Sequence, residues 1–233
     1  FSLAVAVAVA VAVLGCGLAG CTNPNEGDSV AVIGDSITDF DQTDLHEQLG
    51  DEYHLVISGN FGFTIEAVQP QAKFVGARDF DQVIFNIGTN DVLEDLDVDT
   101  SIAALKEEIG YYDSARCVFI VNINEHMINR RTGEVTTDAA ERFNAAFDRL
   151  AEENPRISII DWSGETSATL NNDDPPVSTL TQDSVHPTAE GNRFDPNADL
   201  RYAAIPRDVL PTSECLADVV ARLLPYWFDV LVP

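Results

Sequence analysis

The stretch that most constrains the fold is Asp28–Phe40, with the sequence DSVAVIGDSITDF. Its apolar run, Val30–Ile33, is typical of a buried strand, and Gly34 permits a sharp turn at the carboxyl end of that strand. Ser36 would then lie at the mouth of an α/β sheet, where open parallel sheets bind ligands. Gly, Asp and Ser are also common turn residues. The rest of the chain must therefore decide whether Ser36 is a nucleophile or part of an ordinary turn.

The alternation of strand-like and helix-like segments predicts the fold class. Apolar residues at Ile65, Val68, Ala72 and Val75 have helical spacing and would form one face of a helix. Five strands that alternate with helices predict an α/β fold, with a parallel sheet covered on both faces. The expected strands are 30–33, 53–58, 82–87, 117–123 and 156–160, and the expected helices are 43–49, 65–75, 101–109, 137–150 and 215–224.

Residues 1–20 have the character of a targeting segment. Phe1–Leu14 alternates Ala and Val without a charge, which suits a signal-peptide core better than a bilayer span. Leu18-Ala19-Gly20-Cys21 resembles the lipobox of bacterial lipoproteins, which implies cleavage before Cys21 and lipidation of that residue. We expect a signal peptide over 1–20, a short linker over 21–27 and one domain over 28–233. A buried Ala/Val strand is the alternative for the first segment.

The charge balance limits the partners. With 39 acidic and 13 basic residues the formal net charge is −26, which argues against nucleic acid or an anionic membrane as a partner reached by charge. Membrane attachment would rest on acyl chains, of which two or more are needed for stable anchoring. We expect an exported protein, either a lipoprotein of the cell envelope or a secreted one. The sequence leaves the oligomeric state open.

The cysteines give no indication of metal or redox chemistry. Cys16 and Cys21 belong to the export segment, which leaves Cys117 and Cys215. An exported protein permits a disulfide between this pair, and two unpaired thiols are the alternative. The acidic run at 95–99 begins like a calcium loop but lacks the glycine and the glutamate that such a loop needs. No nucleotide or zinc motif is present, so we predict neither a metal nor a cofactor.

Ser36 needs a base, because an unassisted serine hydroxyl is a poor nucleophile near neutral pH. His186 is the best placed of the four histidines, since Asp183 lies three residues earlier on the same loop and could orient its ring. A surface turn closed by Pro187 is the alternative for this segment. Of the other histidines, His46 and His54 suit structural roles, and His126 could line a cleft.

Acyl transfer also needs donors for the oxyanion that forms on the carbonyl oxygen. Asn90 can offer its side-chain amide from the end of the third strand. Gly62 can bring a backbone N–H close, and Ser36 can offer its own. A loop glycine at 62 and a turn or helix cap at 90 are the structural alternatives.

Four sequence blocks together resemble the SGNH hydrolases, also called GDSL-like esterases or lipases. The blocks are GDSIT at 34–38, G-x-x-G-x-T at 59–64, GTND at 88–91 and DSVHP at 183–187. The resemblance implies a flavodoxin-like three-layer α/β/α sandwich, with Ser36 as nucleophile, His186 as base and Asp183 as its partner. It also implies Gly62 and Asn90 as oxyanion donors. Ile37 replaces the leucine of the family name, and the proline-containing segment 193–211 departs from the direct helix usual in relatives.

The sequence therefore predicts a serine hydrolase that acts on carboxylic esters through an acyl-enzyme. Its substrate would be a small-molecule, glycan or lipid ester. Two alternatives remain open: an acyltransferase or deacetylase acting on cell-envelope glycans, and a surface lipoprotein that binds glycan or lipid without turnover.

Overall fold

Five parallel strands form one sheet at the centre of the protein. In the computed structural model, the described residues are 28–51 and 53–192. The strand order is β2-β1-β3-β4-β5, and each neighbouring pair is parallel. This order is the flavodoxin-like arrangement, so the predicted fold class is confirmed. The strands are β1 (Ser29–Gly34), β2 (His54–Gly59), β3 (Gln82–Asn86), β4 (Cys117–Val121) and β5 (Ile157–Ile160).

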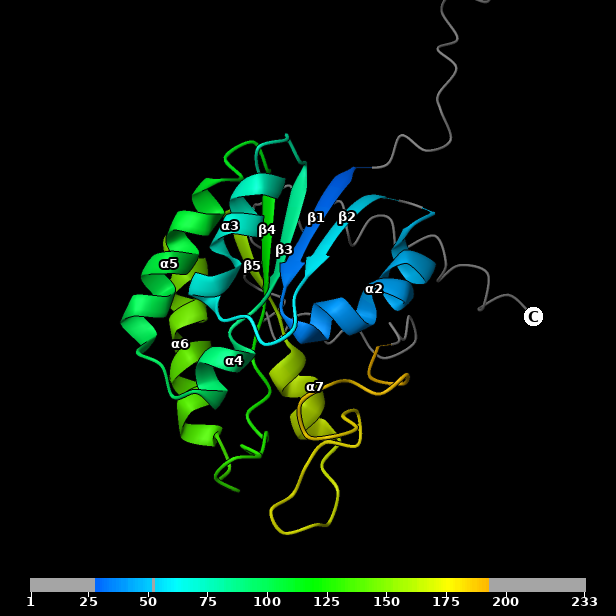
Figure 1. Cartoon of the computed structure of the whole chain (residues 1–233), viewed down its shortest axis with the longest axis vertical. Coiled ribbons are helices and arrows are strands. Elements are labelled where there is room, and N and C mark those ends of the chain that lie inside the picture. Colours follow the sequence, from blue (N-terminus) through cyan, green and yellow to red (C-terminus); the bar gives the residue numbers. More distant parts are fainter. Residues whose placement is uncertain (1–27, 52, 193–233) are drawn as a thin grey trace, which may run out of the picture.

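Helices cover both faces of this sheet. Figure 1 shows α3, α5 and α6 on one side of the strands and α2 on the other. Right-handed crossovers require this distribution, because the chain passes from β1 outward to β2 and then back across β1 to β3. The helices are α2 (Ser36–Leu49), α3 (Ile65–Val75), α4 (Thr89–Leu93), α5 (Val98–Gly110), α6 (Thr137–Glu153) and α7 (Trp162–Ala168).

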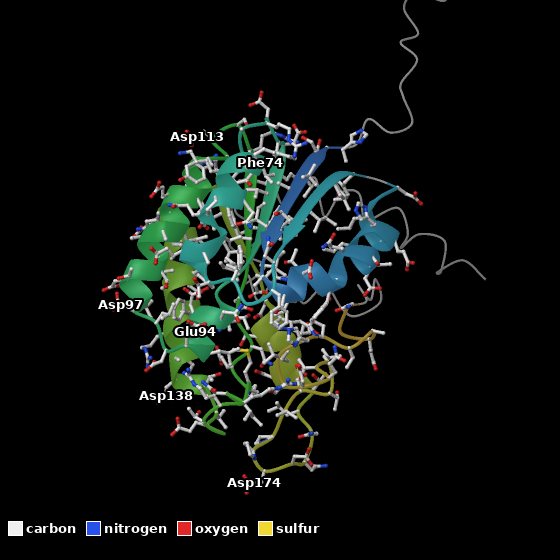
Figure 2. All side chains as sticks on the ribbon, viewed as in Figure 1. Phe74, Glu94, Asp97, Asp113, Asp138 and Asp174 are labelled. Atoms are coloured by element: carbon white, nitrogen blue, oxygen red, sulfur yellow. The ribbon has the colours of Figure 1, made fainter. Side chains whose placement is uncertain are left out.

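The core lies between the sheet and the layer of α3, α5 and α6. Its largest fully buried side chains include Phe85 of β3, Tyr112 after α5, and Phe143 and Phe147 of α6. The Tyr112 hydroxyl donates a hydrogen bond of 3.0 Å to the carbonyl of Ala72, which satisfies its polar end inside an apolar layer. Acidic side chains such as Glu94 and Asp97 lie at the surface of the molecule (Figure 2).

The expected elements differ from the structure mainly at their ends. The helix predicted from residue 43 begins at Ser36, because the Asp35 side chain caps its first turn. The helix predicted over 137–150 begins at Thr137 as expected and extends to Glu153, with Thr136 at its N-cap position. The short helices α4 and α7 were not predicted. The predicted helix 215–224 and the segment 193–211 lie outside the described residues.

Residues 1–20 and 21–27, predicted as signal peptide and linker, also lie outside the described residues. None of the described helices is long and apolar enough to cross a membrane.

Candidate active site

Ser36 lies at the junction of β1 and α2. Asp35 Oδ1 accepts a hydrogen bond of 2.9 Å from the Ile37 N–H, so the helix begins at the serine itself. Gly34 permits this close turn, because a Cβ there would clash with the Thr38 side chain and the Asn86 carbonyl. Ser36 is therefore fixed at the carboxyl edge of the sheet, with its backbone N–H at the positive end of a helix.

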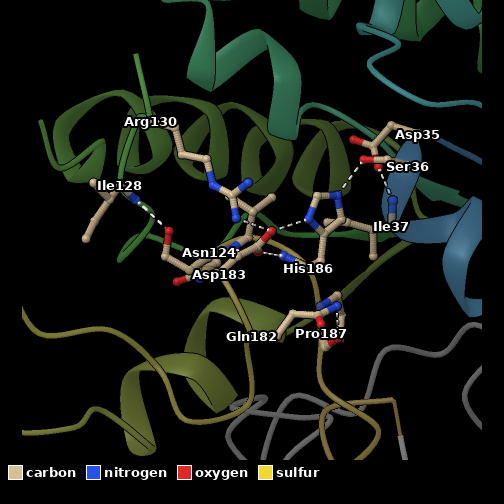
Figure 3. Close-up of polar contacts among 12 residues, drawn as sticks. Asp35, Ser36, Ile37, Asn124, Ile128, Arg130, Gln182, Asp183, His186 and Pro187 are labelled. Atoms are coloured by element: carbon tan, nitrogen blue, oxygen red, sulfur yellow. Dashed lines mark hydrogen bonds and ion pairs between the residues drawn. The ribbon is translucent and has the colours of Figure 1, made fainter. Parts of the chain in front are cut away.

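The structure places His186 and Asp183, which belong to the loop after α7, beside Ser36. Ser36 Oγ lies 2.9 Å from His186 Nε2, although 150 positions separate the two residues. His186 Nδ1 lies 2.8 Å from Asp183 Oδ2. Figure 3 shows the three side chains as one hydrogen-bonded series. With the neutral ring protonated at Nδ1, Nε2 accepts the serine hydrogen and Asp183 accepts the ring hydrogen.

The Asp183 carboxylate is held by its own turn. Its Oδ1 accepts hydrogen bonds from the N–H groups of Val185, at 3.0 Å, and His186, at 2.7 Å. Partial burial opposes the charged form of this carboxyl, but the hydrogen bonds from His186 and Val185 outweigh it and hold the pKa of Asp183 below its ordinary value. Asp183 is therefore an ionised carboxylate at neutral pH, and it orients the imidazole.

The loop that carries Asp183 and His186 is anchored to the segment after β4. Ser184 has a φ of 68°, and its carbonyl accepts a hydrogen bond of 3.0 Å from Asn124 Nδ2. The Ser184 hydroxyl accepts one from the Ile128 N–H, also at 3.0 Å. These two bonds hold Ser184 in a backbone conformation that non-glycine residues rarely adopt.

Arg130 is a further member of the site, and sequence analysis did not identify it. Its Nη2 lies 2.7 Å from Asp183 Oδ2, the oxygen that also faces the His186 ring (Figure 3). Nothing in the sequence around Arg130 forms a recognisable motif, so only the folded contact reveals the pairing. One indication in the sequence that Asn124 belongs to the site is its position directly after the predicted strand 117–123.

The second block forms a turn beside the serine. The Phe63 N–H donates to the Asn60 carbonyl across this turn, and Gly62 has a φ of 73° at its third position. Such a turn favours glycine there, because an L side chain is strained at positive φ. Thr64 then caps α3 by accepting from the Ala67 N–H at 3.3 Å.

Asn90 lies close to both of these segments. Its Nδ2 donates to the Phe63 carbonyl, at 2.9 Å, and to Asp35 Oδ2, at 3.3 Å. The amide hydrogens are thus directed at the Gly62 turn and at the neighbour of Ser36. In this geometry Asn90 must release one of the two bonds, of which the bond to Asp35 is the longer, before it can donate to an oxyanion.

Asp35 and Asp91 are buried carboxyl groups that support the loops around Ser36. Burial raises the pKa of Asp35 to about 7, against the opposing effect of its bond from the Ile37 N–H. Asp91 is also buried, which raises its pKa. It accepts from the Ile65 N–H at 2.9 Å and from Ser101 Oγ at 2.6 Å. Asp91 thereby ties the start of α3 to α5.

The remaining predicted residues lie away from this centre. His46 lies in the last turn of α2, and His54 begins β2. His126 Nε2 lies 3.1 Å from Ser167 Oγ and is not part of the series that joins Ser36 to Asp183. Cys117 is buried and disulfide-bonded, but Cys215 lies outside the described residues, so their pairing stays a prediction. Cys21 lies outside them as well.

Comparison with known proteins identifies a family match over most of the described chain. The sequence model of the GDSL-like Lipase/Acylhydrolase family matches residues 32–194. All five predicted residues of the site, Ser36, Gly62, Asn90, Asp183 and His186, fall within that match.

Solved structures show the same fold. A candidate acylhydrolase from Bacteroides fragilis is 20% identical, with a TM-score of 0.57 over 74% of this chain and 85% of that one. An acetyl xylan esterase variant from Geobacillus stearothermophilus is also 20% identical, with a TM-score of 0.56 over 72% of this chain and 90% of that one. At this identity the likeness concerns the fold alone.

Two curated relatives match the sequence over a short stretch. The 2,3-bisphosphoglycerate-dependent phosphoglycerate mutase of Thermobifida fusca is 51% identical over 47 residues, which are 20% of this chain and 19% of the mutase. The corresponding mutase of Streptomyces avermitilis is 53% identical over 47 residues, with the same two shares. The chain thus spans about a fifth of the length of these relatives, too little to attribute their activity to it.

Proposed function

Because the chain belongs to the GDSL-like lipase/acylhydrolase family, we propose that it cleaves carboxylic esters and that Ser36, His186 and Asp183 carry out the reaction. The observation that supports this most directly is the continuous series of contacts, 2.9 Å from Ser36 Oγ to His186 Nε2 and 2.8 Å from His186 Nδ1 to Asp183 Oδ2. These are the distances that a nucleophile, a base and an orienting carboxylate require.

In the proposed acylation step, Ser36 Oγ attacks the ester carbonyl while His186 Nε2 takes the serine proton. The negative charge that develops on the carbonyl oxygen is stabilised by the N–H groups of Ser36 and Gly62 and by the Asn90 amide. Asp183 stabilises the imidazolium that forms. His186 then protonates the departing alcohol oxygen, which leaves the acyl group on Ser36.

The second step releases the acid. Water enters where the alcohol left, and His186 Nε2 removes its proton as the water oxygen attacks the acyl carbonyl. The tetrahedral intermediate collapses, the C–O bond to Ser36 breaks, and His186 returns the proton to Ser36 Oγ. The protein regains its starting state without a metal or a redox partner.

Replacement of Ser36 tests the proposal. Ser36→Ala should lower the hydrolysis of p-nitrophenyl acetate by at least about a thousandfold and abolish labelling by a fluorophosphonate probe, because the attacking oxygen is lost. Ser167→Ala is the matched control. Ser167 is exposed, and its hydroxyl pairs with His126, outside the series that joins Ser36 to Asp183. Ser36→Ala protein that keeps its melting temperature and still turns over the ester would exclude Ser36 as nucleophile.

We also propose that the protein is exported and carries lipid on Cys21, which the lipobox at residues 18–21 supports. Expression of the full chain in a bacterial host with labelled palmitate provides the test. Cys21→Ala should eliminate the label and shift the protein out of the membrane fraction. Label that survives Cys21→Ala but is lost in Cys16→Ala would assign the modification to Cys16.

A further inference from the structure

Two exposed phenylalanines lie beside the proposed catalytic centre. Phe40 is 55% exposed and Phe61 is 71% exposed, and their ring centroids are 6.3 Å apart in an edge-to-face arrangement. Scattered exposed apolar residues are normal on a protein surface. Two that touch each other on a chain with a net charge of −26 form a local apolar surface.

The pair is built from the same segments that place the reacting groups. Phe40 follows Ser36 by four positions on α2, so the two side chains lie on one face of the helix. Phe61 precedes Gly62 in the turn after β2. The Phe40 ring also packs on the His186 ring, with centroids 5.1 Å apart and an interplanar angle of 63°. An aromatic surface therefore extends from His186 over Phe40 to Phe61.

The position of Phe40 indicates which part of an ester would meet this surface. His186 must protonate the departing alcohol oxygen, so that oxygen has to come within hydrogen-bond distance of Nε2. The group attached to the oxygen then emerges next to the imidazole, where Phe40 lies. The acyl group is attached to the carbonyl carbon on the other side of the scissile bond.

Resting on the proposed function, we propose that Phe40 and Phe61 form a binding subsite for the alcohol portion of the ester, and that this portion is an uncharged hydrocarbon chain or aromatic ring. Apolar contact with two phenyl rings favours such a group. Asp39, the chain neighbour of Phe40 on α2, adds negative charge to this part of the helix, which disfavours an anionic substrate.

Two ester series separate this subsite from an acyl pocket. In the first, the acyl group is acetyl and the alcohol grows from ethanol to hexanol. In the second, the alcohol is methanol and the acyl group grows from acetyl to hexanoyl. We expect kcat/KM to rise along the first series by up to about fourfold for each methylene that contacts a ring. Because all esters of the first series give the same acetyl-enzyme, their deacylation step is identical.

The variants to compare are Phe40→Leu, Phe61→Ala and their combination. The ratio of kcat/KM for hexyl acetate to that for ethyl acetate should fall about threefold to tenfold in Phe61→Ala and further in the combination, whereas Phe40→Leu, which keeps an apolar side chain, should change it less. Phe74→Ala is the matched control. Phe74 is 78% exposed but lies near the end of α3, away from the site (Figure 2).

Several results would overturn the inference. An unchanged ratio in the combined variant, or a loss confined to the acyl series, would remove the pair from the alcohol subsite. If the combined variant loses turnover of acetylated xylose but still hydrolyses hexyl acetate as wild type does, the alcohol portion bound by the pair is a sugar and not a hydrocarbon. If the combined variant no longer binds phosphatidylcholine vesicles but keeps the wild-type ratio of kcat/KM for hexyl and ethyl acetate, the two phenylalanines bind a lipid surface and not the alcohol portion of the ester.

Fluorophosphonate labelling of Ser36 distinguishes failure of this inference from failure of the proposed function. Labelled protein that turns over ethyl acetate but shows no dependence on Phe40 and Phe61 would refute only the subsite. Wild-type protein that is neither labelled nor active on any ester would refute the hydrolase proposal, and the subsite with it.

Discussion

At the scale of single residues, the side-chain amide of Asn90 already lies beside Ser36 but donates its hydrogen bonds to groups of the protein. Its amide donates to the Phe63 carbonyl and to Asp35, and both acceptors hold it between the Ser36 and Gly62 segments. Exchange of the longer bond for one to the substrate oxygen would cost little, because the new partner carries a developing negative charge.

Asn90→Ala should therefore lower kcat for ethyl acetate by about a hundredfold to a thousandfold, as expected when one oxyanion donor is lost, with a smaller change in KM. Steady-state kinetics measure this, and the melting temperature checks that the fold persists. A kcat within about threefold of wild type would exclude Asn90 as an oxyanion donor.

The site residues that could be predicted from the sequence are those whose amino-acid type suits a particular local backbone conformation or lies in a short local motif. Gly62 meets a positive φ, Ser36 follows a buried strand, and Asp183 lies one turn from His186. Phe40, Phe61 and Arg130 could not be predicted, because their roles depend on distances between segments far apart in the chain. No local pattern marks a phenylalanine that touches the ring of His186.

At the scale of elements, the parallel sheet was predictable because its strands are continuous apolar runs between turns. The errors fall where a polar segment is helical. The start of α2 contains Thr38, Asp39 and Asp41 with little apolar periodicity, and α4 and α7 are short. In α2 and α7 the first turn is capped by Asp35 and Asp161, each of which accepts a backbone N–H. The helix α4 follows Gly88 and has no side-chain cap.

The loop after α7 depends on the segment after β4, which leads to a prediction about Asn124. This side chain is 2% exposed, donates to the Ser184 carbonyl at 3.0 Å and accepts from the His126 N–H at 2.8 Å. Asn124→Ala removes the donor to the buried Ser184 carbonyl, at a cost of about 1–3 kcal/mol, and the acceptor of the part-buried His126 N–H. We expect a melting temperature lower by several degrees and a kcat lower by about tenfold.

Calorimetry and kinetics on the Asn124 variant test this anchoring. Ser167→Ala again serves as control, because it removes only an exposed contact to His126. A variant that loses stability but keeps its kcat would show that the bonds from Asn124 are not needed to align His186 with Ser36.

At the scale of the whole molecule, buried acids make stability depend on pH. Burial raises the pKa of Asp35 and of Asp41 to about 7 and that of Glu108 to about 8, with Asp91 and Glu107 adding to the rise at Glu108. Such acids stay protonated in the folded protein at pH values where the unfolded chain has released its protons. Their contribution is complete below their ordinary pKa and is lost as pH rises through the folded pKa.

Glu108 gives the clearest test, because it is fully buried in α5 and neither carboxyl oxygen has a hydrogen-bond partner among the described residues. Wild-type protein should melt at a higher temperature at pH 5 than at pH 8.5. Glu108→Gln should reduce the difference between the melting temperatures at pH 5 and pH 8.5. The reduction should be roughly 2–4 °C for each kcal/mol by which the substitution lowers the pH dependence of the free energy of unfolding. Glu141→Gln, on the exposed side of α6, should leave it unchanged. An equal pH dependence in wild type and Glu108→Gln would contradict this account.

Asp183 and His186 belong to one short turn, whereas Ser36 is the first residue of α2, just after β1. A displacement of that turn would carry acid and base away together and would leave the serine an inert alcohol. The contact between His186 and Asp183 lies within the turn and would persist in such a displacement, whereas the contact between His186 and Ser36 would be lost. We therefore expect the activity to follow the fraction of molecules in which this turn holds His186 against Ser36.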